Sequence, residues 1–210
     1  MQENIEKFLT KYEQYREGFN KMNKYAQAVE AKGAGAKQFK ANVFQSLQAA
    51  MVLHELETYD TVHSAVQPGN GKSFILILLA DYLMNVEGKS FYFGTLNKTL
   101  EKQLRQNVKD YGMRGTILLP EGFKAAKEAD YFLCDEYFSM LANLPVSFGA
   151  VGDEIDGVLG LPSVAKKRIL FSGNHSQQLE DIHDQLYGKD KVKTLHEMQT
   201  ESQLSGAGAI

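Results

Sequence analysis

The sequence has little cysteine and no long hydrophobic run. A single cysteine, Cys134, in 210 residues excludes an intrachain disulfide and is typical of a protein from a reducing compartment. No apolar stretch approaches the roughly 20 residues needed to cross a bilayer. Residues 1–7 lack the apolar core of a signal peptide. We therefore expect a cytoplasmic or organelle-matrix protein without a transmembrane segment.

The chain also lacks a strong excess of charge of either sign. Its net charge of -3 gives no bulk attraction for nucleic acid. A hydrophobic content of 43% and a charged content of 23% are those of an ordinary globular protein. The length is sufficient for one good core and suggests one or two domains. No His shows metal-ligand spacing with Cys or carboxylates, so the sequence does not predict a zinc site.

An amphipathic helix is predicted over residues 5–31, within an N-terminal segment 1–40. Apolar side chains recur there at three- and four-residue steps: Ile5, Phe8, Leu9, Tyr12, Tyr15, Phe19 and Met22. We expect this stripe to pack on the core or flank of the protein's own domain. The alternative is a helix that docks a partner. Residues 32–37, rich in Gly and Ala, predict a linker.

The rest of the chain predicts an α/β fold, because short apolar runs alternate with helical patterns. Such alternation is typical of a parallel sheet with helices on both faces. The predicted strands cover residues 61–66, 90–95, 116–119, 131–134, 147–152 and 168–171. The predicted helices cover residues 41–57, 74–84, 100–111, 121–127 and 137–143. We assign residues 41–196 to one domain and 197–210 to a flexible tail or interdomain linker.

A phosphate-binding loop is predicted over residues 66–73, Val-Gln-Pro-Gly-Asn-Gly-Lys-Ser, between a strand and a helix. Glycines let several N–H groups converge on an anion at a helix N-terminus. Lys72 would reach the outer phosphates, and the Ser73 hydroxyl would hold Mg²⁺. The sequence therefore predicts ATP and Mg²⁺ as cofactors. The predicted nucleotide-binding residues of the loop are Gln67, Pro68, Gly69, Asn70, Gly71, Lys72 and Ser73.

Two acidic pairs compete as partners of this loop. An ATPase needs a carboxylate at the end of another strand for Mg²⁺ and a second one that orients the attacking water. Asp135-Glu136 follows the predicted strand 131–134. Asp153-Glu154 follows the predicted strand 147–152.

Over about residues 43–185 the chain resembles the first RecA-like domain of superfamily 2 helicases. Val66 replaces the leading Gly of the commonest phosphate-loop pattern, and the remaining x-x-G-x-G-K-S form is typical of this superfamily. The motif order of the family places Asp153-Glu154-Ile155-Asp156 in its Asp-Glu-x-Asp slot. The resemblance thus implies that Asp153 holds Mg²⁺ and that Glu154 activates water, with Asp135-Glu136 as the second choice. It also implies coupling roles for four further residues: Thr95, Ser172, Gly173 and Asn174.

The front half is more narrowly similar to the motor domain of the SecA preprotein-translocation ATPase. The similarity lies in Phe44–Glu55, in Thr95-Leu96-Asn97-Lys98-Thr99-Leu100 and in Asp153–Leu159. Extra residues between His54 and the loop are a departure, and the segment between Asp156 and Ser172 leaves no room for a large clamp domain. The resemblance implies a glutamine that hydrogen-bonds adenine. Gln45 fits best because it follows an aromatic residue, and Gln48 is the alternative.

Together these features predict an ATP-hydrolysing motor domain of SecA-like or helicase-like type. The resemblance implies arginines from a second RecA-like domain, in cis or in trans, so we expect weak turnover by this chain alone. A protein substrate is slightly favoured over nucleic acid, since Asp135-Glu136 would repel phosphates. Lys98, Lys102 and Arg105 offer only a modest basic face. The alternatives are a nucleotide-dependent binding module without turnover and the first domain of an RNA or DNA helicase.

Overall fold

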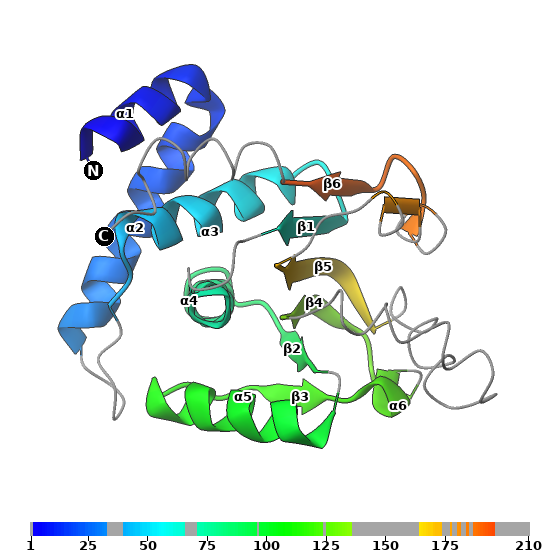
Figure 1. Cartoon of the computed structure of the whole chain (residues 1–210). Helices are drawn as coiled ribbons and strands as arrows, with labels where there is room; N and C mark the ends of the chain where they lie inside the picture. Colours follow the sequence, from blue (N-terminus) through cyan, green and yellow to red (C-terminus); the bar gives the residue numbers. More distant parts are fainter. Residues whose placement is uncertain are drawn as a thin grey trace.

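A computed structural model gives the fold of the chain (Figure 1). It describes residues 2–32, 40–65, 71–95, 97–123, 125–135, 164–173 and 187–195, together with 177, 180, 181 and 184. The predicted linker, the helix at 137–143, the strand at 147–152 and the C-terminal tail lie outside these residues.

The described residues form a six-stranded sheet in which every pairing is parallel. The strand order is β3-β2-β4-β5-β1-β6. The strands are β1 (Thr61–Ala65), β2 (Phe91–Gly94), β3 (Thr116–Leu118), β4 (Ala129–Cys134), β5 (Ala165–Ser172) and β6 (Val192–Thr194). The prediction of a parallel α/β sheet is therefore confirmed. The edge strand β6 was not predicted.

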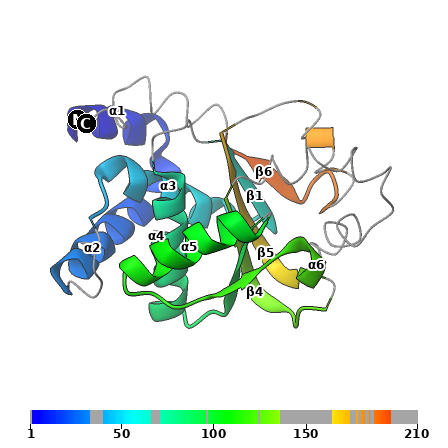
Figure 2. The same ribbon diagram turned by 60° about the horizontal axis from the view of Figure 1, so that its bottom comes forward.

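Most of the described helical structure lies on one face of the sheet. The helices are α1 (Gln2–Lys11), α2 (Arg16–Lys32), α3 (Val43–Glu55), α4 (Lys72–Asn85), α5 (Lys98–Asp110) and α6 (Pro120–Phe123), with a 3₁₀ turn η1 (Glu13–Tyr15). Figure 2 shows α3, α4 and α5 on one side of the sheet and α6 on the other.

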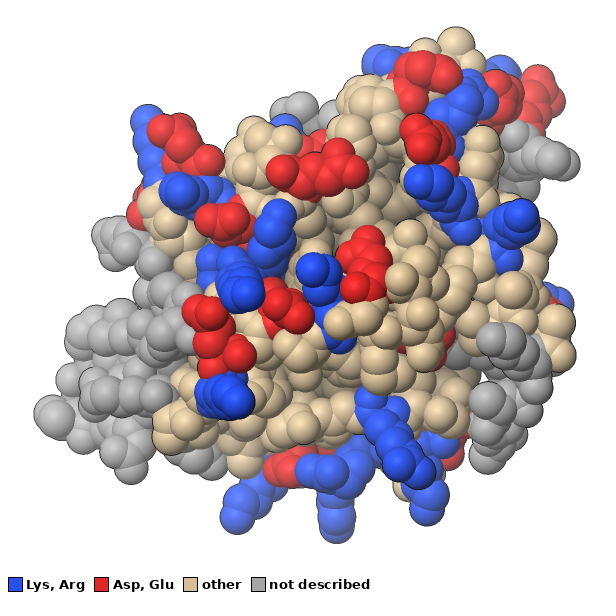
Figure 3. All heavy atoms as spheres, turned by 180° about the vertical axis from the view of Figure 1, so that it is seen from behind, with Lys and Arg blue, Asp and Glu red and all other residues tan. Residues whose placement is uncertain are grey.

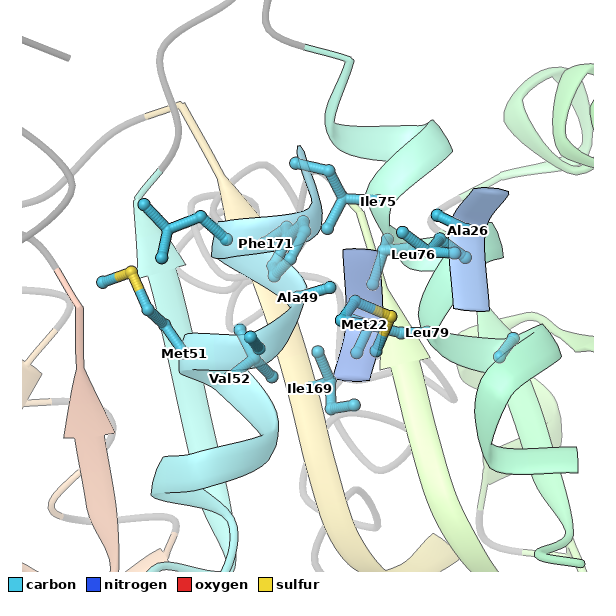
Figure 4. Close-up of a cluster of buried hydrophobic side chains, with 14 of the residues drawn as sticks. Met22, Ala26, Ala49, Met51, Val52, Ile75, Leu76, Leu79, Ile169 and Phe171 are labelled. Atoms are coloured by element: carbon cyan, nitrogen blue, oxygen red, sulfur yellow. The ribbon is translucent and has the colours of Figure 1, made fainter. Parts of the chain in front are cut away.

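The core lies between the sheet and helices α2, α3 and α4 (Figure 4). Helix α4 is buried at its centre, where none of the residues from Ile75 to Ala80 is more than 2% exposed. Such a helix forms from burial on every side rather than from a single apolar stripe. It packs on α3 and β4 and shares one buried cluster with Ile169 and Phe171 of β5, so the helix that begins at the predicted loop is held in the core.

The N-terminal segment folds back on the core and does not form one continuous helix. Residues 5–31 are divided between α1 and α2 by a corner at Tyr12 and η1. Arg16 holds this corner, because its guanidinium binds both Glu13 at 2.7 Å and Glu6 at 2.9 Å. A straight helix of this length would extend for about 40 Å and could not lay both halves on the body.

The apolar stripe of this segment is buried, as the sequence led us to expect. Ile5, Phe8, Leu9, Tyr15, Phe19 and Met22 are each at most 8% exposed. The Tyr15 hydroxyl donates to Glu55 at the end of α3, at 2.7 Å. The stripe thus packs on the protein's own core, with Tyr12 partly buried at its edge.

Candidate functional site: the carboxyl edge of the sheet

Four strands bring polar residues to one edge of the sheet, where their carboxyl ends meet. In register, Gly94 of β2 lies beside Cys134 of β4, and Ala65 of β1 lies beside Ser172 of β5. Thr95 and Asp135 each follow the last residue of a strand. Ligands of open parallel sheets bind at this edge. The predicted loop leaves β1 at the same edge.

Helix α4 begins at this edge with the last three residues of the predicted loop. Gly71 is its N-cap and has φ +71° and ψ +46°, a left-handed conformation that glycine adopts at no steric cost. Lys72 and Ser73 form the first turn of the helix. The N–H groups of such a turn have no partner within the helix and favour an anion. Residues 66–70, including the predicted Gln67, Pro68, Gly69 and Asn70, lie outside the described residues.

Asp135 is the carboxylate that the fold brings to this turn. The Ser73 hydroxyl donates to Asp135 Oδ2 at 2.7 Å, although the two residues are 62 positions apart in the sequence. A hydroxyl and a carboxylate oxygen at this distance form a donor set that suits a Mg²⁺ ion completed by phosphates and water. The observed contact therefore involves the pair that the sequence placed second. Asp153 and Glu154 lie outside the described residues, as does Glu136.

Gln45, the predicted adenine-binding glutamine, lies against the start of α4. It is the third residue of α3, where its side-chain oxygen accepts from the Asn42 N–H at 3.0 Å in a capping box. A Cβ placed on Gly71 would lie 2.5 Å from Gln45 Nε2, so the amide touches the loop. Gln48 is fully buried, and its amide lies 3.9 Å from Met51 Sδ. The geometry favours Gln45.

Ser172 is connected to the strand that leads into the loop. Its hydroxyl shares a hydrogen bond of 2.7 Å with Nε2 of His63 in β1, and both residues are 0% exposed. Sequence analysis gave His63 no role. Its position two residues before the end of the strand preceding the loop is the signal that could have indicated one. Gly173 follows this strand end, and Asn174 lies outside the described residues.

Replacing Ser172 by Ala is expected to lower the free energy of unfolding by about 1–3 kcal/mol, because His63 Nε2 would lose its hydroxyl partner in a buried setting. Urea unfolding of S172A, H63F and the double variant measures this effect. The double variant should be less destabilised than the sum of the single ones. Ser90→Ala is the control, because it removes an exposed hydroxyl that donates to Asp130. Additive losses would mean that the two side chains are not coupled.

A cavity of about 340 Å³ adjoins Ser73 and Asp135. Its floor is Gly94 and Thr95 at the end of β2, and its wall is one face of α5: Leu100, Gln103, Leu104 and Asn107. Thr95 is buried at 5% exposure, and its N–H donates to the Leu118 carbonyl at 3.0 Å. Sequence analysis did not single out Gln103 or Asn107. Their four-residue spacing places both on one face of the helix that follows Thr95, and this spacing is the signal that could have indicated them.

The basic residues of α5 face solvent. Lys98, Lys102, Arg105 and Lys109 are exposed, and Arg105 forms an ion pair with Glu101 at 2.8 Å. Figure 3 shows Lys and Arg side chains projecting from the lower edge of the molecule, which α5 occupies in Figure 1. These cations lie on a different side of α5 from the residues that line the cavity.

The described part of the chain has neither a metal cluster formed by protein side chains alone nor a membrane-spanning helix. It contains no group of three or more His, Cys, Asp or Glu arranged to hold a metal by themselves. A magnesium ion at Ser73 and Asp135 does not require such a group, because phosphates and water supply its other ligands. No described helix has both the length and the apolar character needed to cross a membrane.

Comparison with known proteins adds no assignment. No protein-family model matches this chain, and no curated protein sequence matches it significantly. The resemblance to superfamily 2 motors therefore stays a prediction from short motifs. The function proposed below rests on the geometry of the carboxyl edge.

Proposed function

We propose that this chain binds ATP with Mg²⁺ at the carboxyl edge of its sheet and hydrolyses it as an ATPase domain of the superfamily 2, RecA-like type. The hydrogen bond between Ser73 and Asp135 carries the proposal. A glycine-capped helix, a lysine in its first turn, and a serine paired with a carboxylate from another strand are the parts that a phosphate-loop ATPase requires.

Each residue then has one role. The N–H groups of the first turn of α4 bind phosphate oxygens, and Lys72 neutralises the outer phosphates. Ser73 and Asp135 hold Mg²⁺, which when bound neutralises charge on the phosphates. Glu136, the next residue in the sequence, orients the attacking water. Gln45 binds the adenine edge beside Gly71.

Asp135 thus replaces Asp153 in the proposal, and Glu136 replaces Glu154. The reason is the observed contact: Asp135 is within hydrogen-bonding distance of the serine that a phosphate loop uses for Mg²⁺. Motif order in the sequence supports the other pair, but it gives no distance. Separate Asp→Asn substitutions at positions 135 and 153 distinguish the two assignments.

Turnover is proposed to depend on an arginine from outside this chain. The sequence contains four arginines, and the structure describes all of them. Arg16 holds the α1–α2 corner, Arg105 is exposed on α5, Arg168 binds Thr61, and Arg114 lies beside β3 away from Ser73. None of them lines the cavity at Asp135. An arginine supplied by a second RecA-like domain can raise the rate on the order of 10³–10⁵-fold.

Replacing Lys72 by Ala should weaken ATP binding by about 10–100-fold, since one charge-assisted interaction with a phosphate is lost. Equilibrium titration with a fluorescent ATP analogue measures the dissociation constant. Lys89→Ala is a matched control, because Lys89 is an exposed lysine beyond the opposite end of α4. Unchanged affinity in K72A would contradict the proposed site.

The substrate can be identified as the polymer that stimulates ATP turnover. The exposed basic face of α5 supports the helicase alternative, whereas the net charge of -3 gives no bulk attraction for nucleic acid. Turnover is therefore measured alone, with RNA, with DNA and with an unfolded protein. Tight ATP binding without turnover under every condition would instead support a nucleotide-dependent binding module.

A further inference from the structure

The cavity beside Ser73 and Asp135 has a wall that the proposed function leaves without a role. This wall is the face of α5 that carries Gln103 and Asn107 together with Leu100 and Leu104. The four residues lie at positions i, i+3, i+4 and i+7, so they share one side of the helix. Two carboxamides therefore face a space that is bounded on its other side by the serine and the aspartate.

Gln103 is exposed and Asn107 is partly buried, and within the described part of the chain neither side chain has a hydrogen-bond partner. Each offers one acceptor oxygen and two N–H donors. The Thr95 hydroxyl adds a third polar group at the cavity floor, where the residue is 5% exposed. The cavity thus combines a buried hydroxyl, two amides that have no protein partner there, and two leucines. Its lining can hydrogen-bond a polar, uncharged group next to Ser73 and Asp135.

Water bound to a metal ion has this chemistry. Mg²⁺ demands six ligands, gives up its water reluctantly, and keeps several waters when one or two protein groups and phosphates complete its shell. Each retained water presents polarised hydrogens that need acceptors. At about 30 Å³ per water, a cavity of about 340 Å³ has space for a partial hydration shell.

We propose that Gln103 and Asn107 are positioning residues that accept hydrogen bonds from the water shell of the Mg²⁺ held by Ser73 and Asp135. This inference rests on the proposed function. Neutral amides suit this role because they order the waters without adding a charge that would compete with the phosphates for the ion. Outer-shell partners of this kind typically contribute 10–100-fold to metal affinity.

The test is a magnesium titration of the full chain in the presence of a fluorescent ATP analogue. The variants are Q103L, N107L and the double variant. Gln106→Leu is the control, because Gln106 is an exposed glutamine of the same helix that donates to Asp110 at 2.7 Å and does not line the cavity. Two quantities are measured: the half-saturating Mg²⁺ concentration, and the nucleotide dissociation constant in EDTA.

The double variant is expected to need about tenfold more Mg²⁺ for half-saturation, with an unchanged dissociation constant in EDTA. Gln106→Leu should match the wild type. Gln103→Glu keeps an acceptor oxygen at the same place, so its half-saturating Mg²⁺ concentration should stay at or below the wild-type value. Loss of packing alone would not separate Q103L from Q103E in this way.

Two results would overturn the inference while the proposed function stands. One is a half-saturating Mg²⁺ concentration of the double variant that equals the wild-type value. The other is weaker binding of the analogue to the double variant in EDTA, which would place the amides on the nucleotide itself. A wild-type chain that binds no nucleotide would overturn both proposals together.

Discussion

Asp135→Asn is expected to reduce Mg²⁺-dependent ATP turnover by on the order of 10²–10³-fold, the scale on which removal of one preorganised electrostatic group acts. The asparagine oxygen can still accept from the Ser73 hydroxyl, so the contact between β4 and α4 is kept and the fold with it. Only the negative charge that holds the cation is lost. Phosphate release and the Mg²⁺ dependence of nucleotide binding measure the effect.

Asp153→Asn is the matched comparison, because it makes the same chemical change in the competing acidic pair. It should retain turnover within a few-fold of the wild type. The reverse pattern, an active D135N and an inactive D153N, would return the magnesium site to the pair that motif order favours. Glu136→Gln and Glu154→Gln then locate the residue that orients water by the same comparison.

Gly94→Ala is expected to lower the free energy of unfolding by about 2–3 kcal/mol, although it adds a single methyl group. A Cβ at this position would lie 2.1 Å from Cζ of Phe132, closer than atoms approach. Phe132 is 0% exposed and packs edge-to-face on Phe123, with ring centroids 5.3 Å apart. The ring therefore cannot move aside without disturbing the second face of the sheet.

Thermal and urea unfolding measure this effect, which corresponds to a fall in Tm of roughly 4–12 °C for a chain of this size. The double variant G94A/F132L should be less destabilised than the sum of the two single variants by about 1 kcal/mol or more, because the smaller side chain removes the clash. Gly122→Ala is the control, since a Cβ added there would lie 3.9 Å from its nearest neighbour, Leu118 Cδ2. A G94A protein as stable as G122A would show that the sheet absorbs the methyl group.

Between residues 41 and 134 the type and order of the helices and strands could be predicted, because apolar residues repeat at different spacings in the two kinds of element. The alternation of short apolar runs with helical patterns gave β1, β2, β3 and β4 and the helices between them. The N-terminal corner could not be predicted, because the apolar spacing is the same in one helix as in two. No Gly or Pro marks Tyr12, and the break is held by Arg16 through contacts with Glu6 and Glu13. Strand β6 is three residues long, too short to show a period.

The site was predictable only where its parts are close in sequence. Gly71, Lys72 and Ser73 form one motif, and Gln45 was preferred from its neighbour Phe44. The choice between two Asp-Glu pairs depends on a contact across 62 residues, which no local pattern contains. The place of Gln103 on the cavity depends on how α5 crosses the sheet, and that crossing is set by packing.

The parallel sheet has a consequence for the order in which the protein can fold. Strand β1 ends at Ala65, but its central partner β5 begins only at Ala165, and Thr61 binds Arg168 across 107 residues. At about 5–20 residues per second of synthesis, β5 leaves the ribosome roughly 5–20 s after β1. Contacts of such long range form slowly. During that interval α4 can pack on α2 and α3, which precede it in the chain, but its sheet-facing side lacks the central strands β4 and β5. The nascent chain therefore presents the sheet-facing side of α4, the helix proposed to bind nucleotide, as a site for chaperones or for aggregation.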